Sequence, residues 1–285
     1  MRLRLTIAFL LLFSLGTLAH AQKRAVYDVY AIEFGLSNTW TPISEIAIDS
    51  KSTDSVRFAF YVWYLKGDSG KKVLVDAGFL EDPAQRDTDI VRSVERYQRP
   101  DSALQRLHVS ADEITDVVIT HPHWDHIGGL DLFRKATVWM QKKDFAYFVG
   151  DAWQKGADNR GLKKADVPKI IRANLEGRLR LIDGDSVEII PGIRVFTGSK
   201  HTFESQHLLV QTKTENVLLA SDDAWFYYNI EHAVSVPLTF DAVAYARGLR
   251  RMKTLVSNPA LIIPGHDALV MSRFERVAEG VVKIR

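Results

Sequence analysis

The sequence predicts an α/β fold in which a sandwich of strands carries helices on its outside. Short apolar segments rich in β-branched residues alternate with helix-like segments through two similar halves of the chain. Residues 22–285 have ordinary apolar content and are numerous enough to build one large core. No linker rich in Pro, Gly or Ser interrupts them, so we predict a single domain over residues 22–285.

The first 21 residues have the pattern of a secretory signal. Arg2 and Arg4 precede an apolar run from residue 7 to residue 18, and residues 19–21 (Ala-His-Ala) form a small-x-small cleavage site. The run is too short to span a bilayer. We expect cleavage near Ala21 and export to the periplasm or the medium, without a stable membrane anchor. An uncleaved anchor is the alternative.

Composition excludes several classes of function. Loss of the leader takes the 37 basic residues to 35, equal to the 35 acidic residues. A mature chain without net charge has no electrostatic footprint for nucleic acid or anionic lipid. The chain has no cysteine, which excludes disulfides, thiolate metal ligands and a cysteine nucleophile.

Strands are expected where apolar and β-branched residues alternate or run together. In chain order they are residues 27–34, 56–66, 71–75, 116–119, 136–140, 187–190, 193–196, 208–211, 217–220 and 261–263. Residues 67–70 (Gly-Asp-Ser-Gly) form a turn between the second and third of them, because Gly is flexible and Asp and Ser bond their own backbone.

Helices are expected in between. The helical segments are residues 102–107, 142–148, 164–175 and 240–255, and the last of them has the best pattern. Ser110 and Glu113 fit a capping box that opens one further turn. Residues 80–100 are polar and charged, which predicts a loop with some helix.

One stretch concentrates groups that bind metals. Residues 121–126 read His-Pro-His-Trp-Asp-His, although the chain holds only nine histidines in 285 residues. They follow the expected strand at 116–119 and therefore lie on a loop at the carboxyl end of a strand, where α/β proteins place their chemistry. Neutral imidazole and carboxylate are ligands for zinc, iron or manganese. His121 and His123 can converge on one ion, while Asp125 and His126 are better placed for another. Residues 128–129 (Gly-Gly) then lead toward a helical stretch.

Residues 120–129 resemble the signature of the metallo-β-lactamase superfamily of binuclear hydrolases, which implies three more ligands downstream. His201, within Gly-Ser-Lys-His-Thr, is similar to the histidine of the family's G-H-T turn. Lys200 stands where Gly is common, so we expect this turn to be built differently. His266, within Pro-Gly-His-Asp, is similar to the last histidine ligand.

In this family one aspartate is shared by both metals, and the segment 218–223 resembles the strand end that carries it. Asp222 is the first choice because Asn229 follows it by seven residues, as in the lactonase-like branch, and Asp223 is the alternative. Asp76, in a Val-Asp-x-Gly context, resembles the carboxylate that orients a ligand histidine from behind. A plain turn residue at the end of a strand is the other interpretation of Asp76.

The resemblance covers about residues 27–280 and implies an αββα sandwich with two mixed sheets flanked by helices. It implies two divalent cations, zinc as first choice with iron or manganese as alternatives. One would be held by His121, His123 and His201, the other by Asp125, His126 and His266, with Asp222 shared. A hydroxide formed on the metals would attack the substrate, and Asp125 would orient it and carry its proton to the leaving group.

The substrate implied is a small molecule with a lactone, ester or amide bond, because the segments around His201 and Asp222 look most like the N-acyl homoserine lactonase-like branch. Those lactonases often place Tyr three residues after the shared Asp, where this chain has Trp225. Tyr227 or Tyr228 could supply the missing hydroxyl, and Trp124, Trp225 and Phe226 could line an apolar acyl pocket. Plain core packing is the competing interpretation of these aromatic residues.

Three alternatives stay open at this point. A β-lactamase of the cysteine-free type fits the length and the leader, and a non-hydrolytic metallo-oxidoreductase of the same fold is the second. A binding protein that has lost catalysis is the third, although such a protein would be expected to lack at least one ligand.

Overall fold

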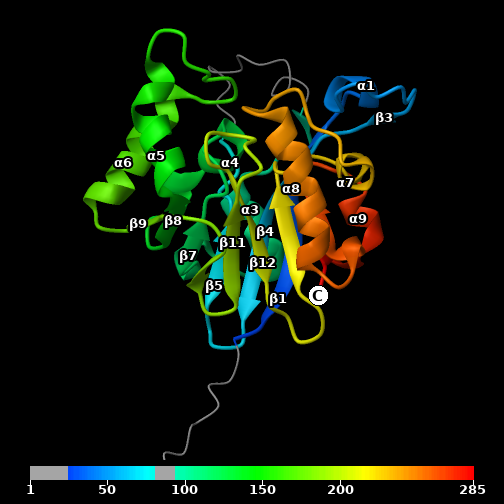
Figure 1. Cartoon of the computed structure of the whole chain (residues 1–285). Coiled ribbons are helices and arrows are strands. Elements are labelled where there is room, and N and C mark those ends of the chain that lie inside the picture. The colour runs from blue at the N-terminus through cyan, green and yellow to red at the C-terminus, as the bar shows by residue number, and fades with distance from the viewer. Residues whose placement is uncertain (1–24, 81–93) are drawn as a thin grey trace, which may run out of the picture.

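The computed structural model describes residues 25–80 and 94–285, and its strands form two main sheets with helices on both sides (Figure 1). The signal expected at residues 1–21 lies outside these ranges. The strands are β1 (Tyr27–Ser37), β2 (Thr41–Pro42), β3 (Ser55–Val56), β4 (Ala59–Gly67), β5 (Lys72–Val75), β6 (Val94–Glu95), β7 (Asp116–Val118), β8 (Thr137–Gln141), β9 (Leu179–Ile182), β10 (Val187–Ile190), β11 (Ile193–Thr197), β12 (Gln206–Val210), β13 (Val217–Ser221), β14 (Ile262–Pro264), β15 (Glu275–Ala278) and β16 (Val281–Lys283).

The helices of the described part connect these strands. The α-helices are α1 (Ile43–Ile46), α3 (Pro100–Leu104), α4 (Trp124–Ile127), α5 (Lys142–Val149), α6 (Val167–Leu175), α7 (Tyr227–His232), α8 (Ala242–Leu255) and α9 (Val270–Arg273). The single 3-10 turns are η2 (Gln105–Leu107), η3 (Ala111–Glu113), η4 (Leu130–Leu132), η5 (Asp151–Trp153), η6 (Lys164–Asp166) and η7 (Pro259–Leu261).

The larger sheet has nine strands within residues 25–80 and 94–285, in the order β15-β16-β1-β4-β5-β7-β8-β9, with β6 paired to β1. Pairing is antiparallel from β15 to β5 and parallel from β5 to β9. The first strand pairs with the last one, since Tyr30 lies opposite Lys283 and the Val29 amide donates to the carbonyl of Arg285 at 2.8 Å. Because β5 and β7 are parallel, the residues after them meet at the same edge of the sheet.

The second sheet has five strands in the order β10-β11-β12-β13-β14 among the described residues. Its pairs are antiparallel except β13 and β14, which run parallel with Leu219 opposite Ile263. Strands β2 and β3 form a separate short ribbon. Both main sheets are mixed or contain a parallel pair, as the sandwich expected from the sequence requires.

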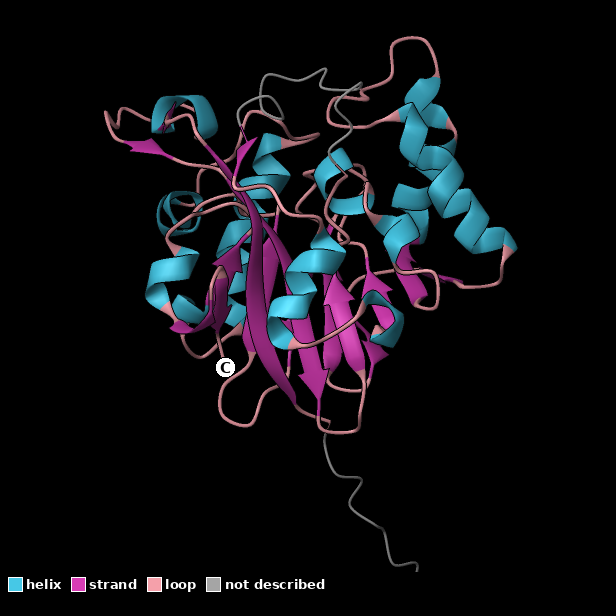
Figure 2. Ribbon diagram, turned by 180° about the vertical axis from the view of Figure 1, so that it is seen from behind, coloured by secondary structure: helices cyan, strands magenta, loops and turns pink. Residues whose placement is uncertain are grey.

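Alternation along β1 explains the layers. Val29 and Ala31 enter the core between the sheets, which also contains Leu208 of β12 and Met252 of α8. Ile32, the next residue along, points to the opposite face, where α3, α5 and α6 pack. Figure 1 shows α8 over the strands of the second sheet and α5 beside α6, and Figure 2 shows the other side of the molecule. The layers follow one another in space as helices, sheet, sheet and helices, which confirms the predicted fold class.

Most expected elements are present, and the exceptions have physical reasons. The strand expected at 56–66 is divided, because the chain leaves the β2–β3 ribbon before β4 begins and Phe58 makes only an isolated bridge with Asp267. The helical stretch expected after residues 128–129 is the 3-10 turn η4, and a further helix, α4, begins earlier at Trp124, inside the histidine motif. Strands β9, β15 and β16 and helix α7 were not expected, and β15 is a mostly exposed edge whose polar residues give no strand pattern.

The capping box is confirmed, since the carboxylate of Glu113 accepts the Ser110 amide at 2.9 Å. Among the described residues, the structure contains no helix with the length and hydropathy needed to span a bilayer.

Candidate metal centre

Three histidines and one aspartate from distant parts of the chain meet at one edge of the sandwich. The ligand-type atoms of His121, His123, His201 and Asp222 all lie within 4.8 Å of one another. Nδ1 of His123 is 3.0 Å from Nε2 of His121 and 3.1 Å from Nε2 of His201. Imidazole nitrogens and a carboxylate that converge in this way form a zinc-type ligand set.

A second group lies directly beside the first and consists of Asp125, His126 and His266. Oδ2 of Asp125 is 3.5 Å from Nε2 of each histidine. Oδ1 of Asp222 is 3.2 Å from Nε2 of His126 and 3.0 Å from Nε2 of His266, while Oδ2 of Asp222 is 3.2 Å from Nε2 of His201. Asp222 therefore turns one oxygen to each group, the arrangement expected of a shared ligand.

Both groups are built from segments that follow strand ends. His121 and His123 follow β7, His201 follows β11, Asp222 follows β13, and His266 follows β14. The motif turns into α4 directly after His123. Asp125 and His126 therefore occupy the first turn of α4, where they form the second group with His266. This helix inside the motif, for which the sequence has no separate signal, is thus what separates the ligands of the two groups.

Asp76 lies fully buried behind this cluster and accepts hydrogen bonds from three segments. Its Oδ2 accepts from Nδ1 of His126 at 2.8 Å and from the Ser221 hydroxyl at 3.1 Å, and its Oδ1 accepts the Thr120 amide at 2.8 Å. The bond to Nδ1 leaves Nε2 of His126 as the atom that faces the ligand set. Asp76 and Ser221 both have positive φ, 61° and 46°, so the backbone is strained where these contacts form.

His266 is oriented by the backbone of β4. Its Nδ1 donates to the carbonyl of Ala59 at 3.0 Å, and the Ala59 amide donates back to the carbonyl of His266 at 2.8 Å. Nε2 of His266 is therefore the atom left to face Asp222 and Asp125.

Asp223, the alternative for the shared ligand, points elsewhere. It accepts the Ser205 hydroxyl at 2.6 Å and Nδ1 of His207 at 2.8 Å, and both of its partners are buried. Ser205 in turn accepts the amide of His201 at 3.1 Å. Asp223 thus supports the turn that carries His201, and Asp222 is the aspartate that joins the two groups.

The turn around Lys200 corrects an expectation. Lys200 itself adopts the left-handed conformation, with φ of 61°, so the turn keeps a backbone typical of Gly although the residue differs. Its ammonium donates to the carbonyl of Phe203 at 2.7 Å and pairs with Glu204. These contacts offset the strain that a side chain brings at this position.

The electrostatics fit cations. Burial, and then the neighbouring imidazoles, lowers the pKa of His121 well below its usual value and that of His123 to about 3, so both rings are neutral and keep a lone pair. Burial would also lower the pKa of His126, but Asp125, Asp222 and Asp76 outweigh it and raise that pKa. Nε2 of His126 and Oδ1 of Asp222 are buried without hydrogen-bond geometry, which a cation between them would resolve.

Asp144 of α5 holds the His201 turn from its other side. It is buried and accepts the hydroxyl of Thr202 at 2.7 Å and the amide of Glu204 at 3.1 Å. Burial raises the pKa of Asp144 to about 7, against the effect of these two hydrogen bonds. Nothing in the local sequence indicates this role, because Asp144 lies inside an ordinary amphipathic helix.

Gly161 packs against His123. Its carbonyl accepts the Trp124 amide at 3.0 Å, and a Cβ at this position would lie 2.6 Å from Cδ2 of His123. Gly161 has φ of 75°, so both its conformation and its surroundings require Gly. The loop between α5 and α6 therefore fixes the ring of one ligand.

A pocket of about 320 Å³ opens onto the cluster. His123, Asp125, Asp222 and His266 line it, and four aromatic rings form its apolar wall: Phe58, Phe60, Trp124 and Trp225. The two Trp were predicted here, whereas Phe58 and Phe60 were not, and the third predicted ring, Phe226, is buried outside the lining. The alternation of residues along the chain indicates that Phe58 and Phe60 share one face. It does not indicate that this face contacts His266.

The tyrosines expected at the substrate lie elsewhere. Neither Tyr227 nor Tyr228 lines the pocket. The ring of Tyr227 is buried with the Arg273 guanidinium 3.6 Å above it, and the hydroxyl of Tyr228 bonds Ser50 at 2.8 Å. Both residues belong to α7, and this unexpected helix turns their side chains away from the cluster.

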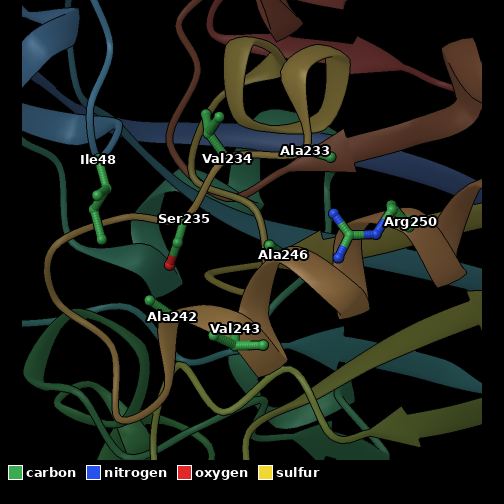
Figure 3. A pocket seen from close by; sticks show the side chains of 8 residues that line it. All are labelled: Ile48, Ala233, Val234, Ser235, Ala242, Val243, Ala246 and Arg250. Carbon is green, nitrogen blue, oxygen red and sulfur yellow. The ribbon is translucent and has the colours of Figure 1, made fainter.

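Figure 3 shows a second hollow, which differs in kind. It lies between Ile48, the segment after α7 and the first turns of α8, and Arg250 is its one charged lining residue among the described part of the chain. No histidine or carboxylate of that part lines it, whereas residues of both ligand groups line the first pocket.

Comparison with known families decides the identity of this arrangement. The sequence model of the metallo-β-lactamase superfamily matches residues 56–266, a span that includes both ligand groups. The chain belongs to the metallo-β-lactamase superfamily. Together with the His/Asp cluster, this membership makes the protein a metal-dependent hydrolase, as the sequence predicted.

Individual relatives are distant but similar over most of their length. An N-acyl homoserine lactonase of Bacillus sp is 24% identical over 234 residues, 78% of this chain and 87% of the relative. The N-acyl homoserine lactonase AiiA of Bacillus thuringiensis subsp. kurstaki is 23% identical over 236 residues, with the same coverage.

Solved structures show the same fold. A mutant of B. thuringiensis AiiA with N-decanoyl-L-homoserine bound at the active site aligns with a TM-score of 0.69 at 21% identity, over 88% of this chain and 98% of that one. The dizinc quorum-quenching lactonase AidC aligns with a TM-score of 0.61 at 14% identity, over 81% and 86%.

Replacement of Gly161 by Val should disturb His123. The new side chain would collide with the imidazole, so we expect zinc to bind at least about tenfold more weakly, as when a contact that orients a ligand is lost. Gly156→Val is the matched control, since Gly156 has φ of 84° and open space around it. Competition with a chromogenic chelator measures the affinity. Equal zinc binding by the two variants would contradict a role of Gly161 in placing His123.

Replacement of Asp144 by Asn should change how stability depends on pH. The folded state holds the Asp144 proton more tightly than the unfolded chain does, so this carboxyl opposes folding increasingly as the pH rises from about 4 to about 7. Asn cannot ionise. The melting temperature of the metal-free variant should therefore exceed that of the metal-free wild type by more at pH 8 than at pH 5. Each kcal/mol of difference in the free energy of unfolding corresponds to roughly 2–4 °C.

Thermal melts in the presence of chelator test this expectation, with Asp112→Asn at an exposed ion pair as control. A difference between Asp144→Asn and wild type that stays constant with pH would contradict it.

Proposed function

We propose that the protein is an exported binuclear hydrolase that opens lactones or cleaves related esters, similar to the N-acyl homoserine lactonases. The observation that carries the proposal is the position of Asp222, which turns one oxygen to each of two ligand groups on the floor of an aromatic pocket. The similarity to curated lactonases supports the choice of substrate class.

The residues present fit two divalent cations, with zinc as first choice. His121, His123 and His201 would hold one cation, and Asp125, His126 and His266 the other, with Asp222 between them. Each group offers imidazole and carboxylate donors without a cysteine, a set that zinc, iron or manganese accepts.

When bound, the cations supply an activated water, whose pKa coordination lowers from 15.7 towards about 7, and they polarise the substrate carbonyl. Asp125 turns Oδ2 towards His126 and His266, so Oδ1 is the oxygen available to take a proton from the attacking water. The same oxygen can return that proton to the alkoxide released when the ester bond of the ring breaks. Asp125 lines the pocket, where such a transfer has to take place.

The aromatic wall fits the apolar part of a substrate. Phe58, Phe60 and Trp124 surround the approach to Asp125 with rings that exclude water and can pack on an acyl chain. Polar groups stand at the side of the pocket formed by β1, β2 and α1, where Ser37, Thr41 and Glu45 contribute. A substrate with a polar head near the cluster and an apolar tail along the rings matches this division.

Export is the second part of the proposal and is supported by the leader pattern of residues 1–21. An exported enzyme would then meet its small-molecule lactone substrate outside the cytoplasm. Expression with and without these residues, followed by fractionation and N-terminal sequencing, tests this part separately.

The substrate class is tested with zinc-replete protein and a panel of acyl homoserine lactones, simple lactones, aryl esters and a chromogenic cephalosporin. We expect lactones to be the best substrates, chelation to abolish turnover, and elemental analysis to give two zinc equivalents per chain. A preference for the cephalosporin would replace the proposal with a β-lactamase. One equivalent or none would contradict the binuclear site.

Asp125→Asn separates chemistry from folding. Asn keeps the size of the side chain but cannot carry the proton, so lactone turnover should fall by at least about 10². The melting temperature should stay close to that of Asp112→Asn, which alters only an exposed ion pair. Turnover near the wild-type level would show that Asp125 does not transfer the proton.

A further inference from the structure

We infer that Trp225 is a positioning residue whose indole N–H fixes the shared carboxylate of Asp222 between the two cation sites. The inference rests on the proposed function in one respect, namely that two cations share Asp222. It concerns how the chain holds that carboxylate, which neither the family nor the ligand set explains.

The contact is short and directed to one oxygen. Nε1 of Trp225 donates to Oδ2 of Asp222 at 2.7 Å, a distance typical of a hydrogen bond to an ionised acceptor. Oδ2 is the oxygen that faces the first group, at 3.2 Å from Nε2 of His201. A carboxylate can rotate about its last bond, so a donor on one oxygen decides which oxygen faces which group.

The indole cannot easily move away from this position. Its ring packs edge-on against Phe58 with centroids 5.5 Å apart, and it also contacts the rings of His201 at 5.8 Å and His266 at 6.3 Å. The backbone carbonyl of Trp225 accepts the His266 amide at 2.9 Å. Trp225 therefore touches ligands of both groups and is held by the segment that carries one of them.

Two further contacts hold Asp222 from other sides. The hydroxyl of Tyr245 donates to the backbone carbonyl of Asp222 at 2.9 Å. Gly265 lies against the carboxylate so closely that a Cβ there would be 2.7 Å from Oδ1. Backbone and Oδ1 are thus restrained by neighbours, and Trp225 supplies a short side-chain hydrogen bond to Oδ2.

This contact changes the role expected for Trp225. An indole has a single donor, and here it is engaged with a ligand carboxylate, so it cannot also bind a substrate carbonyl. The ring still lines the pocket, but its polar atom serves the metal site. Trp225 therefore does not replace the Tyr that N-acyl homoserine lactonases often have here in binding the substrate; it holds the carboxylate of Asp222.

The test measures zinc affinity, not turnover. Trp225→Phe keeps an aromatic ring and removes the N–H. Trp139→Phe is the matched control, because the indole of Trp139 donates to another buried carboxylate, Asp116, at 3.0 Å, outside the ligand groups. Each chain is stripped of metal and titrated with zinc against a chromogenic chelator, and the metal-free melting temperature is recorded.

We expect Trp225→Phe to bind at least one zinc equivalent about 10–100-fold more weakly, as when a hydrogen bond to a ligand is lost, while Trp139→Phe binds both like wild type. Wild-type affinity for both equivalents in Trp225→Phe would overturn the inference. Wild-type protein that binds two zinc ions without opening lactones would contradict the proposed function and leave the inference standing.

If Phe at position 225 impairs folding, a closer substitute decides. Site-specific replacement of Trp225 by its benzothiophene analogue keeps the fused ring and exchanges the N–H for sulfur. The same loss of zinc affinity supports the inference, and unchanged affinity overturns it.

Discussion

The buried carboxylate of Asp76 is the contact on which the rest of the metal centre depends. It follows β5 of the larger sheet and accepts donors from Thr120, His126 and Ser221, and Ser221 belongs to β13 of the second sheet. A buried carboxylate is costly unless donors surround it, so this residue is stable only when both sheets are in place. Each donor is adjacent to a metal-type ligand or is one itself. The joining of the sheets and the assembly of the site are therefore the same event.

The support of the ligands is divided between the two sheets in a consistent way. Asp76 orients His126, the backbone of Ala59 orients His266, and Asp223 with Ser205 holds the backbone of His201. These supports come from the strands or strand ends, whereas the pocket wall comes from rings that can change without moving them. Trp225 belongs to both sets. This division explains how the pocket wall can vary without disturbing the ligands.

The sequence was informative where function is encoded in short local patterns. The ligands lie in turns after strands, and both the turns and the strands have recognisable residues, as in 121–126 and 264–267. Contacts across the chain were not predictable in the same way. Phe58 and Phe60 reach the pocket because β4 pairs with the segment of His266, about 200 residues away, and Asp222 and Asp223 look equivalent until the positions of Ser205 and His207 are known. Helix α7 was missed, and with it the true direction of Tyr227 and Tyr228.

The pairing of β1 with β16 has a consequence for how the protein is made. The strand that leaves the ribosome first cannot complete its sheet until Val281–Lys283 and the carbonyl of Arg285 are available to it. Closing a loop of this length is slow compared with local contacts. The larger sheet is therefore among the last parts of the fold to close, and until it closes the edge of β1 at Tyr30–Ile32 has no partner strand. Late closure of this sheet would suit the export proposed above, because a chain passes through a secretion channel unfolded.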